Sequence, residues 1–265
     1  MSLTIPTILD EIVGDTKQLV SKRKRLMPLS QLREQEYFNR TCVALEAKFP
    51  FESFGFIAEA KKASPSQGII RPDFDPIGIA ISYEEHGAAA ISMLTEPLHF
   101  KGDIQYLADC RPHVSIPILR KDFILDPYQL VEAKAYGADA VLLIATILER
   151  NQMQELQAAA RELGLSVLLE VYSEAELDRV DVDKTPIIGA NSRDLNTFEV
   201  NLDHAIRVLS GLPSTCIRIA ESGIHSPDDV VLLRDKGLQG ALIGEAFMRQ
   251  DNPGLGLSRF IEAIS

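Results

Sequence analysis

The sequence has few cysteines and no long hydrophobic run, and each shortage excludes a class of protein. Its three cysteines, Cys42, Cys110 and Cys216, lie far apart and form no CxxC pair, which argues against a disulfide framework or a zinc site. No stretch approaches the roughly 20 apolar residues of a membrane-spanning helix. The opening residues MSLTIPTILDEIVGD carry acids where a secretory signal needs a basic end and an apolar core. We therefore expect an unexported protein of the reducing cytoplasm with no membrane association.

Positive charge is also scarce. The 265 residues include 27 Lys and Arg against 38 Asp and Glu, which gives a formal net charge of −11. Because binding to a phosphate backbone requires a local excess of Lys and Arg, this balance argues against a nucleic-acid partner. One basic run spans 17–25. No aromatic residue interleaves its charges, so we interpret it as a solvated helix face rather than a nucleic-acid patch.

Short apolar runs alternate with longer amphipathic segments from residue 54 onward. Glycines close several amphipathic segments just before the next run, at Gly87, Gly137, Gly164 and Gly237, and glycine readily adopts the left-handed conformation that ends a helix. The apolar runs are predicted to be strands and the amphipathic segments helices. The predicted strands lie in 54–60, 88–94, 116–123, 139–145, 166–171, 186–191, 216–222 and 239–245.

Eight consecutive strand–helix units, with strands apolar on both faces, predict an α/β fold of the (β/α)8 TIM barrel type. An open doubly wound sheet is the competing interpretation, but no GxGxxG follows the first strand and no second helical domain is evident. Residues 1–50 are predicted to form two extra helices, over 5–25 and 28–38, which cap the barrel or cover its rim. We therefore expect residues 1–265 to form a single barrel domain with an N-terminal helical extension.

Polar residues end five of the predicted strands, where the active sites of such barrels lie. Period-two alternation places Glu59 and Lys61 on one face of the first strand, and Lys121 and Phe123 on one face of the third. Together the five strand ends offer Glu59, Lys61, Lys121, Phe123, Glu170, Asn191 and Glu221. One such residue alone commonly begins a solvated loop, but lysines beside glutamates in a partly desolvated pocket are typical of acid–base catalysis.

Glycines follow the last two predicted strands. Ser222 and Gly223 come after the seventh strand and Gly244 after the eighth, and each group is expected to open a helical segment. Backbone N–H groups at a helix N-terminus bind anions, glycine permits close approach, and such barrels commonly hold phosphate between these two loops. The pattern predicts a phosphorylated small-molecule substrate.

The segment IAEAKKASPSQG at 57–68 resembles the first-strand signature of the indole-3-glycerol phosphate synthase family. The N-terminal helical extension is also a feature of that family. Because the first motif is long and the others fall in order on consecutive predicted strands, the resemblance covers most of the chain. The further matching motifs are LRKDFI (119–124), DPYQ (126–129), GADAVLLI (137–144), LLEV (168–171), GANSRDL (189–195), ESGI (221–224) and IGEAFMR (243–249).

The resemblance implies a carboxy-lyase that closes the indole ring in tryptophan biosynthesis. The substrate is expected to be 1-(2-carboxyphenylamino)-1-deoxyribulose 5-phosphate. The expected products are indole-3-glycerol phosphate, carbon dioxide and water. No metal or organic cofactor is expected, and the chain is expected to be a monomer or a weak homo-oligomer.

The resemblance also implies catalytic roles for matched residues. Lys121 resembles the general acid that protonates the ketone oxygen during ring closure. Lys61 and Glu170 are both candidates to protonate the departing hydroxyl, and Glu59 is either a base or the partner that keeps Lys61 charged. Asn191 is expected to hydrogen-bond the substrate hydroxyls or to orient Glu170.

Other matched positions are expected to bind the substrate. Phe123 is expected to pack on the anthranilate ring, and Ser64 to contact the substrate from a loop that is a candidate lid. Some relatives have serine where Glu245 stands here, so this carboxylate is expected to point away from the phosphate and leave only its backbone N–H to serve. The remaining expected contacts are Glu221 and, for the phosphate, Ser222, Gly223 and Gly244, aided by the charge of Lys61.

Three other functions are alternatives to this one. Phosphoribosylanthranilate isomerase acts on an adjacent phosphosugar, but it calls for a Cys and an Asp at strand ends, whereas Glu59 and Lys61 end the first strand here. An aldolase-like enzyme would use Lys61 or Lys121 as a Schiff-base nucleophile. A non-catalytic phosphometabolite-binding barrel would bind without turnover, which the full acid–base set disfavours.

Overall fold

The computed structural model describes residues 7–193 and 199–264. The predicted first helix includes residues 5 and 6, which lie outside the described residues. The helices are α1 (Ile8–Leu26), α2 (Leu29–Arg33), α3 (Pro76–Glu85), α4 (Gln105–Cys110), α5 (Pro127–Ala135), α6 (Arg150–Glu162), α7 (Glu174–Leu177), α8 (Leu202–Ser210), α9 (Pro227–Asp235), α10 (Glu245–Met248) and α11 (Pro253–Glu262). The strands are β1 (Gly55–Ala60), β2 (Ala63–Ser64), β3 (Gly68–Ile69), β4 (Ala90–Leu94), β5 (Ile118–Lys121), β6 (Ala140–Ile144), β7 (Ser166–Val171), β8 (Ile187–Asn191), β9 (Ile217–Glu221) and β10 (Gly240–Ile243).

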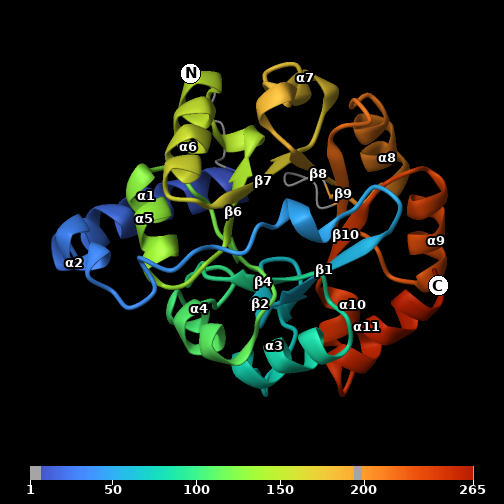
Figure 1. Ribbon diagram of the computed structural model, residues 1–265, viewed down its shortest axis with the longest axis horizontal. Helices are drawn as coiled ribbons and strands as arrows, with labels where there is room; N and C mark the ends of the chain where they lie inside the picture. Colours follow the sequence, from blue (N-terminus) through green and yellow to red (C-terminus); the bar gives the residue numbers. More distant parts are fainter. Residues whose placement is uncertain (1–6, 194–198, 265) are drawn as a thin grey trace.

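Eight parallel strands close into a barrel in the order β1-β10-β9-β8-β7-β6-β5-β4. Helices surround this barrel (Figure 1). Every predicted strand contains one barrel strand, so the predicted (β/α)8 architecture is confirmed. The sequence did not predict the antiparallel hairpin of β2 and β3, which lies in the connection after β1. Because all eight strands run in the same direction, their carboxyl ends meet at one mouth.

Apolar side chains alternate along each barrel strand between two layers. Ile57 and Leu119 belong to a cluster inside the barrel, whereas their neighbours Phe56 and Ile118 belong to the larger cluster between strands and helices. Burial of both faces explains why the strands are almost continuously apolar in the sequence. Fully burying one such side chain stabilises the fold by about 1.5–3 kcal/mol.

The predicted helix-ending glycines adopt left-handed backbone conformations. Their φ angles are 88° at Gly87, 90° at Gly137, 72° at Gly164 and 79° at Gly237. Each lies between a helix and the next barrel strand. The turn from helix to strand therefore uses a conformation that other residues rarely adopt.

The basic run of α1 is mostly solvated, as predicted, because Lys17, Lys24 and Arg25 are exposed. Lys22 is exposed as well. Arg23 is partly buried and lies 3.2 Å from Glu132 of α5, and the exposed Lys24 lies 2.7 Å from Asp126, the N-cap of α5. Together with a shared apolar cluster, these ion pairs hold α1 and α2 beside α5 (Figure 1).

The N-terminal extension closes both ends of the barrel. Leu9 and Ile12 of α1 line the mouth and belong to the inner apolar cluster. Leu45 and Phe49, which flank the turn before β1, belong to the same cluster from the opposite end. The ring of Phe49 lies so close to the start of β1 that a Cβ at Gly55 would be 2.7 Å from it. The extension thus covers the mouth with a helix and plugs the far end with a ring.

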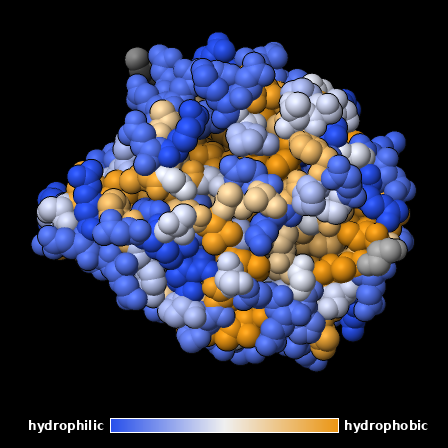
Figure 2. Space-filling view, viewed as in Figure 1, coloured by the Kyte–Doolittle hydropathy of each residue, from blue (hydrophilic) through white to orange (hydrophobic). Residues whose placement is uncertain are grey.

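No helix of the described residues is long and apolar enough to cross a membrane. On the face shown in Figure 2, hydrophilic residues dominate and hydrophobic residues gather toward the middle. All three cysteines are free thiols.

Phe49→Ala is expected to lower the free energy of unfolding by about 3–5 kcal/mol, because it leaves a cavity where the ring plugs the barrel. Phe49 is 1% exposed, whereas Phe51, the matched control, is 50% exposed. Phe51→Ala is expected to change the same free energy by about 0.5 kcal/mol or less. Urea unfolding followed by circular dichroism measures both variants. Equal losses would contradict the role of Phe49 as a plug.

Candidate active site

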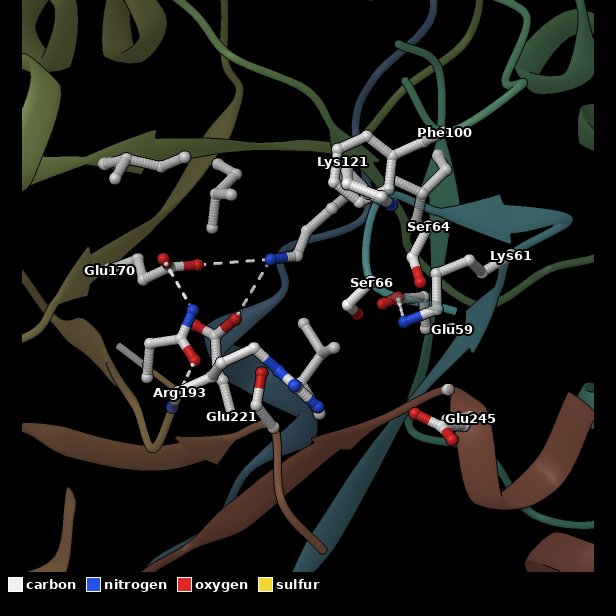
Figure 3. A pocket seen from close by; sticks show the side chains of 18 of the residues that line it. Glu59, Lys61, Ser64, Ser66, Phe100, Lys121, Glu170, Arg193, Glu221 and Glu245 are labelled. Atoms are coloured by element: carbon white, nitrogen blue, oxygen red, sulfur yellow. Dashed lines mark hydrogen bonds and ion pairs between the residues drawn. The ribbon is translucent and has the colours of Figure 1, made fainter. Parts of the chain in front are cut away.

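All of the residues predicted for catalysis and substrate binding line one pocket at the mouth of the barrel (Figure 3). They come from the ends of several strands and from the loops that follow them. The alternation argument therefore identified the side chains that face the mouth. The predicted residues are Glu59, Lys61, Ser64, Lys121, Phe123, Glu170, Asn191, Glu221, Ser222, Gly223 and Gly244.

Lys121 lies at the end of β5 between two carboxyl groups. Its Nζ is 3.1 Å from Oε2 of Glu170 on β7 and 3.2 Å from Oε2 of Glu221 on β9. Asn191, at the end of β8, donates a hydrogen bond from Nδ2 to Oε1 of Glu170 at 3.0 Å. One amine, two carboxyl groups and one amide from different strands thus form a continuous network (Figure 3). We call these four residues the Lys121 network.

Lys61 and Glu59 form a second, separate ion pair in the same pocket. Nζ of Lys61 is 2.9 Å from Oε1 of Glu59. Ser64 lies close by on the β2–β3 hairpin (Figure 3). The acid–base residues that the sequence suggested as one set are therefore two groups, and each lysine has its own carboxyl partners. This arrangement agrees with Glu59 as the partner of Lys61.

Burial and neighbouring charges shift the pKa values of the Lys121 network in different directions. Burial opposes ionisation of Glu170, but Lys121 and Asn191 outweigh it, so the pKa of Glu170 is lowered. Burial raises the pKa of Glu221 to about 8, with Lys121 opposing and Glu170 adding to the rise. Burial disfavours the charged form of Lys121, but Glu170 and Glu221 raise its pKa overall. Near neutral pH, Lys121 is therefore charged, Glu170 is ionised and Glu221 retains a proton.

Two positions beside the pocket carboxyl groups are glycine, and a Cβ at either would crowd a glutamate side chain. A Cβ at Gly189 of β8 would lie 2.1 Å from Oε1 of Glu221, and a Cβ at Gly244 would lie 3.0 Å from Oε1 of Glu59. Oε1 of Glu221 is buried and has no hydrogen-bond partner among the described residues. The sequence did not reveal the requirement for Gly189, because it depends on a side chain from the neighbouring strand.

Aromatic and aliphatic side chains form an apolar wall of the pocket. Phe123, which was predicted, packs against Phe100 with ring centroids 6.0 Å apart. Ile8 and Leu9 of α1 complete this wall. Phe100 was missed because it lies in the loop beyond β4, where no strand-end rule applies. The only feature of the sequence that pointed to Phe100 as a pocket residue was its position shortly after a predicted strand.

Arg193 also lines the pocket and was missed. Its backbone N–H donates to Oδ1 of Asn191 at 3.0 Å. A signal was present, because the GANSRDL motif places a basic residue two positions after Asn191 and thus in phase with it. The last two residues of that motif, 194 and 195, lie outside the described residues.

One of the two glycine loops differs from its prediction. Gly244 is the N-cap of α10, which begins at Glu245 as expected. Ser222 and Gly223 do not open a helix: their φ angles are 64° and 70°, and α9 begins only at Pro227. The prediction was wrong because two successive left-handed residues form a tight turn, which cannot continue into a right-handed helix. This turn nevertheless lines the pocket.

The charge of Glu245 is offset by a neighbour. Its Oε1 accepts hydrogen bonds from Nη2 of Arg249 at 2.9 Å and from Nε at 3.1 Å. The carboxylate is thus paired along α10, although Glu245 lines the pocket. That only its backbone N–H serves an anion stays a prediction. Across the described chain, no cluster of three or more His, Cys, Asp or Glu side chains is arranged to hold a metal ion.

Solved structures with this fold include enzymes and enzyme subunits that share little sequence with the chain. A mutant tryptophan synthase alpha-subunit from Pyrococcus furiosus superposes with a TM-score of 0.61 at 18% identity, covering 81% of this chain and 99% of that one. Orotidine 5'-phosphate decarboxylase from Pyrococcus horikoshii superposes with a TM-score of 0.59 at 12% identity, covering 78% and 98%. At these identities the likeness supports the barrel fold alone.

Sequence comparison is far more specific. The family model described as indole-3-glycerol phosphate synthase matches residues 9–260. The indole-3-glycerol phosphate synthase of Salinibacter ruber is 53% identical over 255 residues, which cover 96% of this chain and 94% of the relative. That of Chromobacterium violaceum is 45% identical over 262 residues, which cover 97% and 99%. The chain therefore belongs to the indole-3-glycerol phosphate synthase family.

Proposed function

We propose that this chain converts 1-(2-carboxyphenylamino)-1-deoxyribulose 5-phosphate to indole-3-glycerol phosphate, carbon dioxide and water. The observation that carries the proposal is the Lys121 network beside an apolar wall. A cationic acid next to an aromatic-lined surface suits a substrate whose aromatic ring bears a carboxylate. Membership of the family supports the same reaction.

The pocket offers separate surfaces for the two ends of this substrate. Phe123 and Phe100 flank the place for the carboxyphenyl ring, and Lys121 lies near enough to attract its carboxylate. Ser222, Gly223 and Gly244 lie in the two loops proposed to hold the phosphate. Binding both ends at once would bring the ring carbon toward the ribulose ketone, which lowers the entropic cost of ring closure.

Ring closure needs a proton at the ketone oxygen. As the ring carbon that bears the carboxylate attacks the ketone carbon, the carbonyl π bond breaks and its electron pair moves to oxygen. Lys121 donates the proton that converts this alkoxide to a hydroxyl. Its raised pKa keeps the amine charged, so it has a proton to give. The same charge makes Lys121 a poor Schiff-base nucleophile, because that role requires a neutral amine.

The later steps need a second acid and a base. Loss of carbon dioxide restores the benzene ring, after which the hydroxyl leaves as water and a proton departs from the new five-membered ring. Lys61, held by Glu59 at 2.9 Å, protonates the leaving hydroxyl. Glu170 accepts the departing proton, because its lowered pKa keeps it ionised near neutral pH and so able to take up a proton. Asn191 orients Glu170 through the 3.0 Å hydrogen bond.

We also propose that the enzyme works in a reducing cytoplasm as a monomer or weak homo-oligomer, on a small phosphorylated substrate and without a nucleic-acid or membrane partner. Three free cysteines support a reducing compartment. The formal charge of −11 opposes nucleic-acid binding.

The reaction is tested by adding the carboxyphenylamino substrate and recording the absorbance and fluorescence of the indole product. Wild-type protein is expected to form product, and its failure to do so would overturn the proposed function. Lys121→Ala is expected to lower kcat by about 100-fold or more, because it removes the proton donor. Lys236→Ala, an exposed control remote from the pocket, is expected to leave kcat unchanged. Near-normal turnover by Lys121→Ala would rule out the acid role.

The raised pKa of Glu221 predicts a pH-dependent stability. Because the folded pKa of about 8 lies above the ordinary value of 4.5, the folded state holds the proton more tightly than the unfolded state. This contribution is fully present below the ordinary pKa and is lost as pH rises through about 8. Between pH 7 and pH 9, wild-type protein is expected to lose about 1 kcal/mol more unfolding free energy than Glu221→Gln. Urea unfolding at both pH values measures the difference, and equal losses would contradict the shift.

Inorganic phosphate is expected to compete with the substrate for the glycine loops. Gly223→Ala is expected to weaken this inhibition by about tenfold or more, because a Cβ there would lie 2.2 Å from Val200 and shift the loop. Gly164→Ala is the matched control, since Gly164 has a similar positive φ of 72° but open space around it. Inhibition constants for phosphate in the three proteins measure the effect. Non-competitive inhibition, or equal constants, would exclude phosphate binding at this loop.

A further inference from the structure

The loop after β4 is built around a buried carboxylate that the proposed mechanism does not use. Glu96 is 1% exposed. Its two oxygens accept hydrogen bonds from the backbone N–H groups of Leu98 at 2.9 Å, His99 at 2.7 Å and Phe100 at 2.9 Å. Three backbone donors on one carboxylate fix the path of a segment that has no regular secondary structure. We call residues 96–102 the Glu96 loop.

The end of the Glu96 loop is equally constrained. The backbone N–H of Gly102 donates to the carbonyl of Glu96 at 2.8 Å, which closes the loop on itself. A Cβ at Gly102 would lie 2.4 Å from the carbonyl oxygen of Leu94, so the loop packs directly on the end of β4. Lys101 has a φ of 56°, an unusual conformation for a residue with a side chain. The loop is thus held in one shape from both ends.

This shape delivers two side chains to the mouth of the barrel. Phe100 enters the pocket and packs at 6.0 Å from Phe123. Nε2 of His99 lies 3.0 Å from Oδ2 of Asp15 on α1, the helix that covers the mouth. Glu96 itself does not line the pocket. Its effect on a ligand must therefore pass through the backbone that it binds.

We infer that Glu96 is a positioning residue for the aromatic end of the substrate, because its carboxylate holds the backbone that presents Phe100 to the pocket. The inference rests on the proposed function for the identity of the aromatic ligand. Loss of the Glu96 contacts frees Phe100 from its place beside Phe123 and widens the ring site. The two glycine loops lie on other strands and do not depend on Glu96, so phosphate binding is left intact.

The test compares binding of anthranilate, as a probe for the aromatic end, with inhibition by inorganic phosphate. The chain contains no tryptophan, so the fluorescence of anthranilate can be followed without an indole background. Glu96→Gln retains the size of the side chain but removes its charge and turns an amide N–H₂ toward a backbone donor. It is expected to weaken anthranilate binding by roughly tenfold and to raise KM similarly. Its kcat and its phosphate inhibition constant are expected to stay within about twofold of the wild type.

A double-mutant cycle separates positioning from general stability. If Glu96 acts through Phe100, then Glu96→Gln is expected to cause little further loss of anthranilate affinity in a Phe100→Ala background. Additive losses in the cycle would overturn the inference, as would unchanged anthranilate affinity in Glu96→Gln. A parallel loss of phosphate inhibition would overturn it too, because it would indicate general damage to the pocket. Glu155→Gln, on the exposed face of α6, serves as the charge-matched control.

Two further outcomes, an unfolded variant and a wild-type protein without turnover, can also be interpreted. If circular dichroism shows that Glu96→Gln is unfolded, Glu96→Asp takes its place, since it keeps the charge but is one methylene too short to reach all three donors. Anthranilate affinity equal to wild type in a folded Glu96→Asp would then overturn the inference. If wild-type protein binds anthranilate and phosphate but forms no indole product, the proposed function fails while the binding comparison still tests Glu96.

Discussion

A charged lysine held between two carboxyl groups inside the barrel is the interaction on which the pocket depends. Without partners, Lys121 would be a costly charge in a largely desolvated place. Glu170 and Glu221 supply those partners at 3.1 and 3.2 Å. One cation cannot fully compensate two buried anions, so one carboxyl group ionises and the other keeps its proton. The lysine thereby sets the protonation state of both acids around it.

Neighbouring residues hold the side chains of the Lys121 network in place. Gly189 gives Glu221 the room it needs, and Asn191 holds the ionised Glu170. At the mouth, α1 contributes apolar side chains to the pocket wall. Apolar lining lowers the local dielectric, which strengthens the electrostatic interactions of the pocket. The Glu96 loop ties that helix to the aromatic wall through His99. Helix α1 and the Glu96 loop are therefore connected, and together they form part of the wall of the pocket beside the Lys121 network.

The formal charge of −11 describes the surface at a distance and not the pocket. Within the pocket, Lys61 is matched by Glu59 and Lys121 by Glu170. The proton on Glu221 removes one negative charge from the pocket. The carboxylates of Asp122 and Glu245, which also line the pocket, are paired with Arg120 and Arg249. A substrate that carries both a carboxylate and a phosphate thus meets no excess of negative charge, and backbone N–H groups of the glycine loops can complete its binding.

Local rules in the sequence determined the barrel and most of the pocket. Alternation of apolar runs and amphipathic segments sufficed for the eight strands, because strand and helix periods are set by backbone geometry. The alternation of side chains along each strand was enough to predict which residues face the mouth, because the carboxyl ends of parallel strands meet there. Only the tertiary structure decided which carboxyl group pairs with which lysine, that Gly189 must be small, that Ser222 and Gly223 form a turn rather than a helix start, and that Phe100 enters the pocket. These features depend on contacts between residues far apart in the chain, and short-range periodicity carries no information about such contacts.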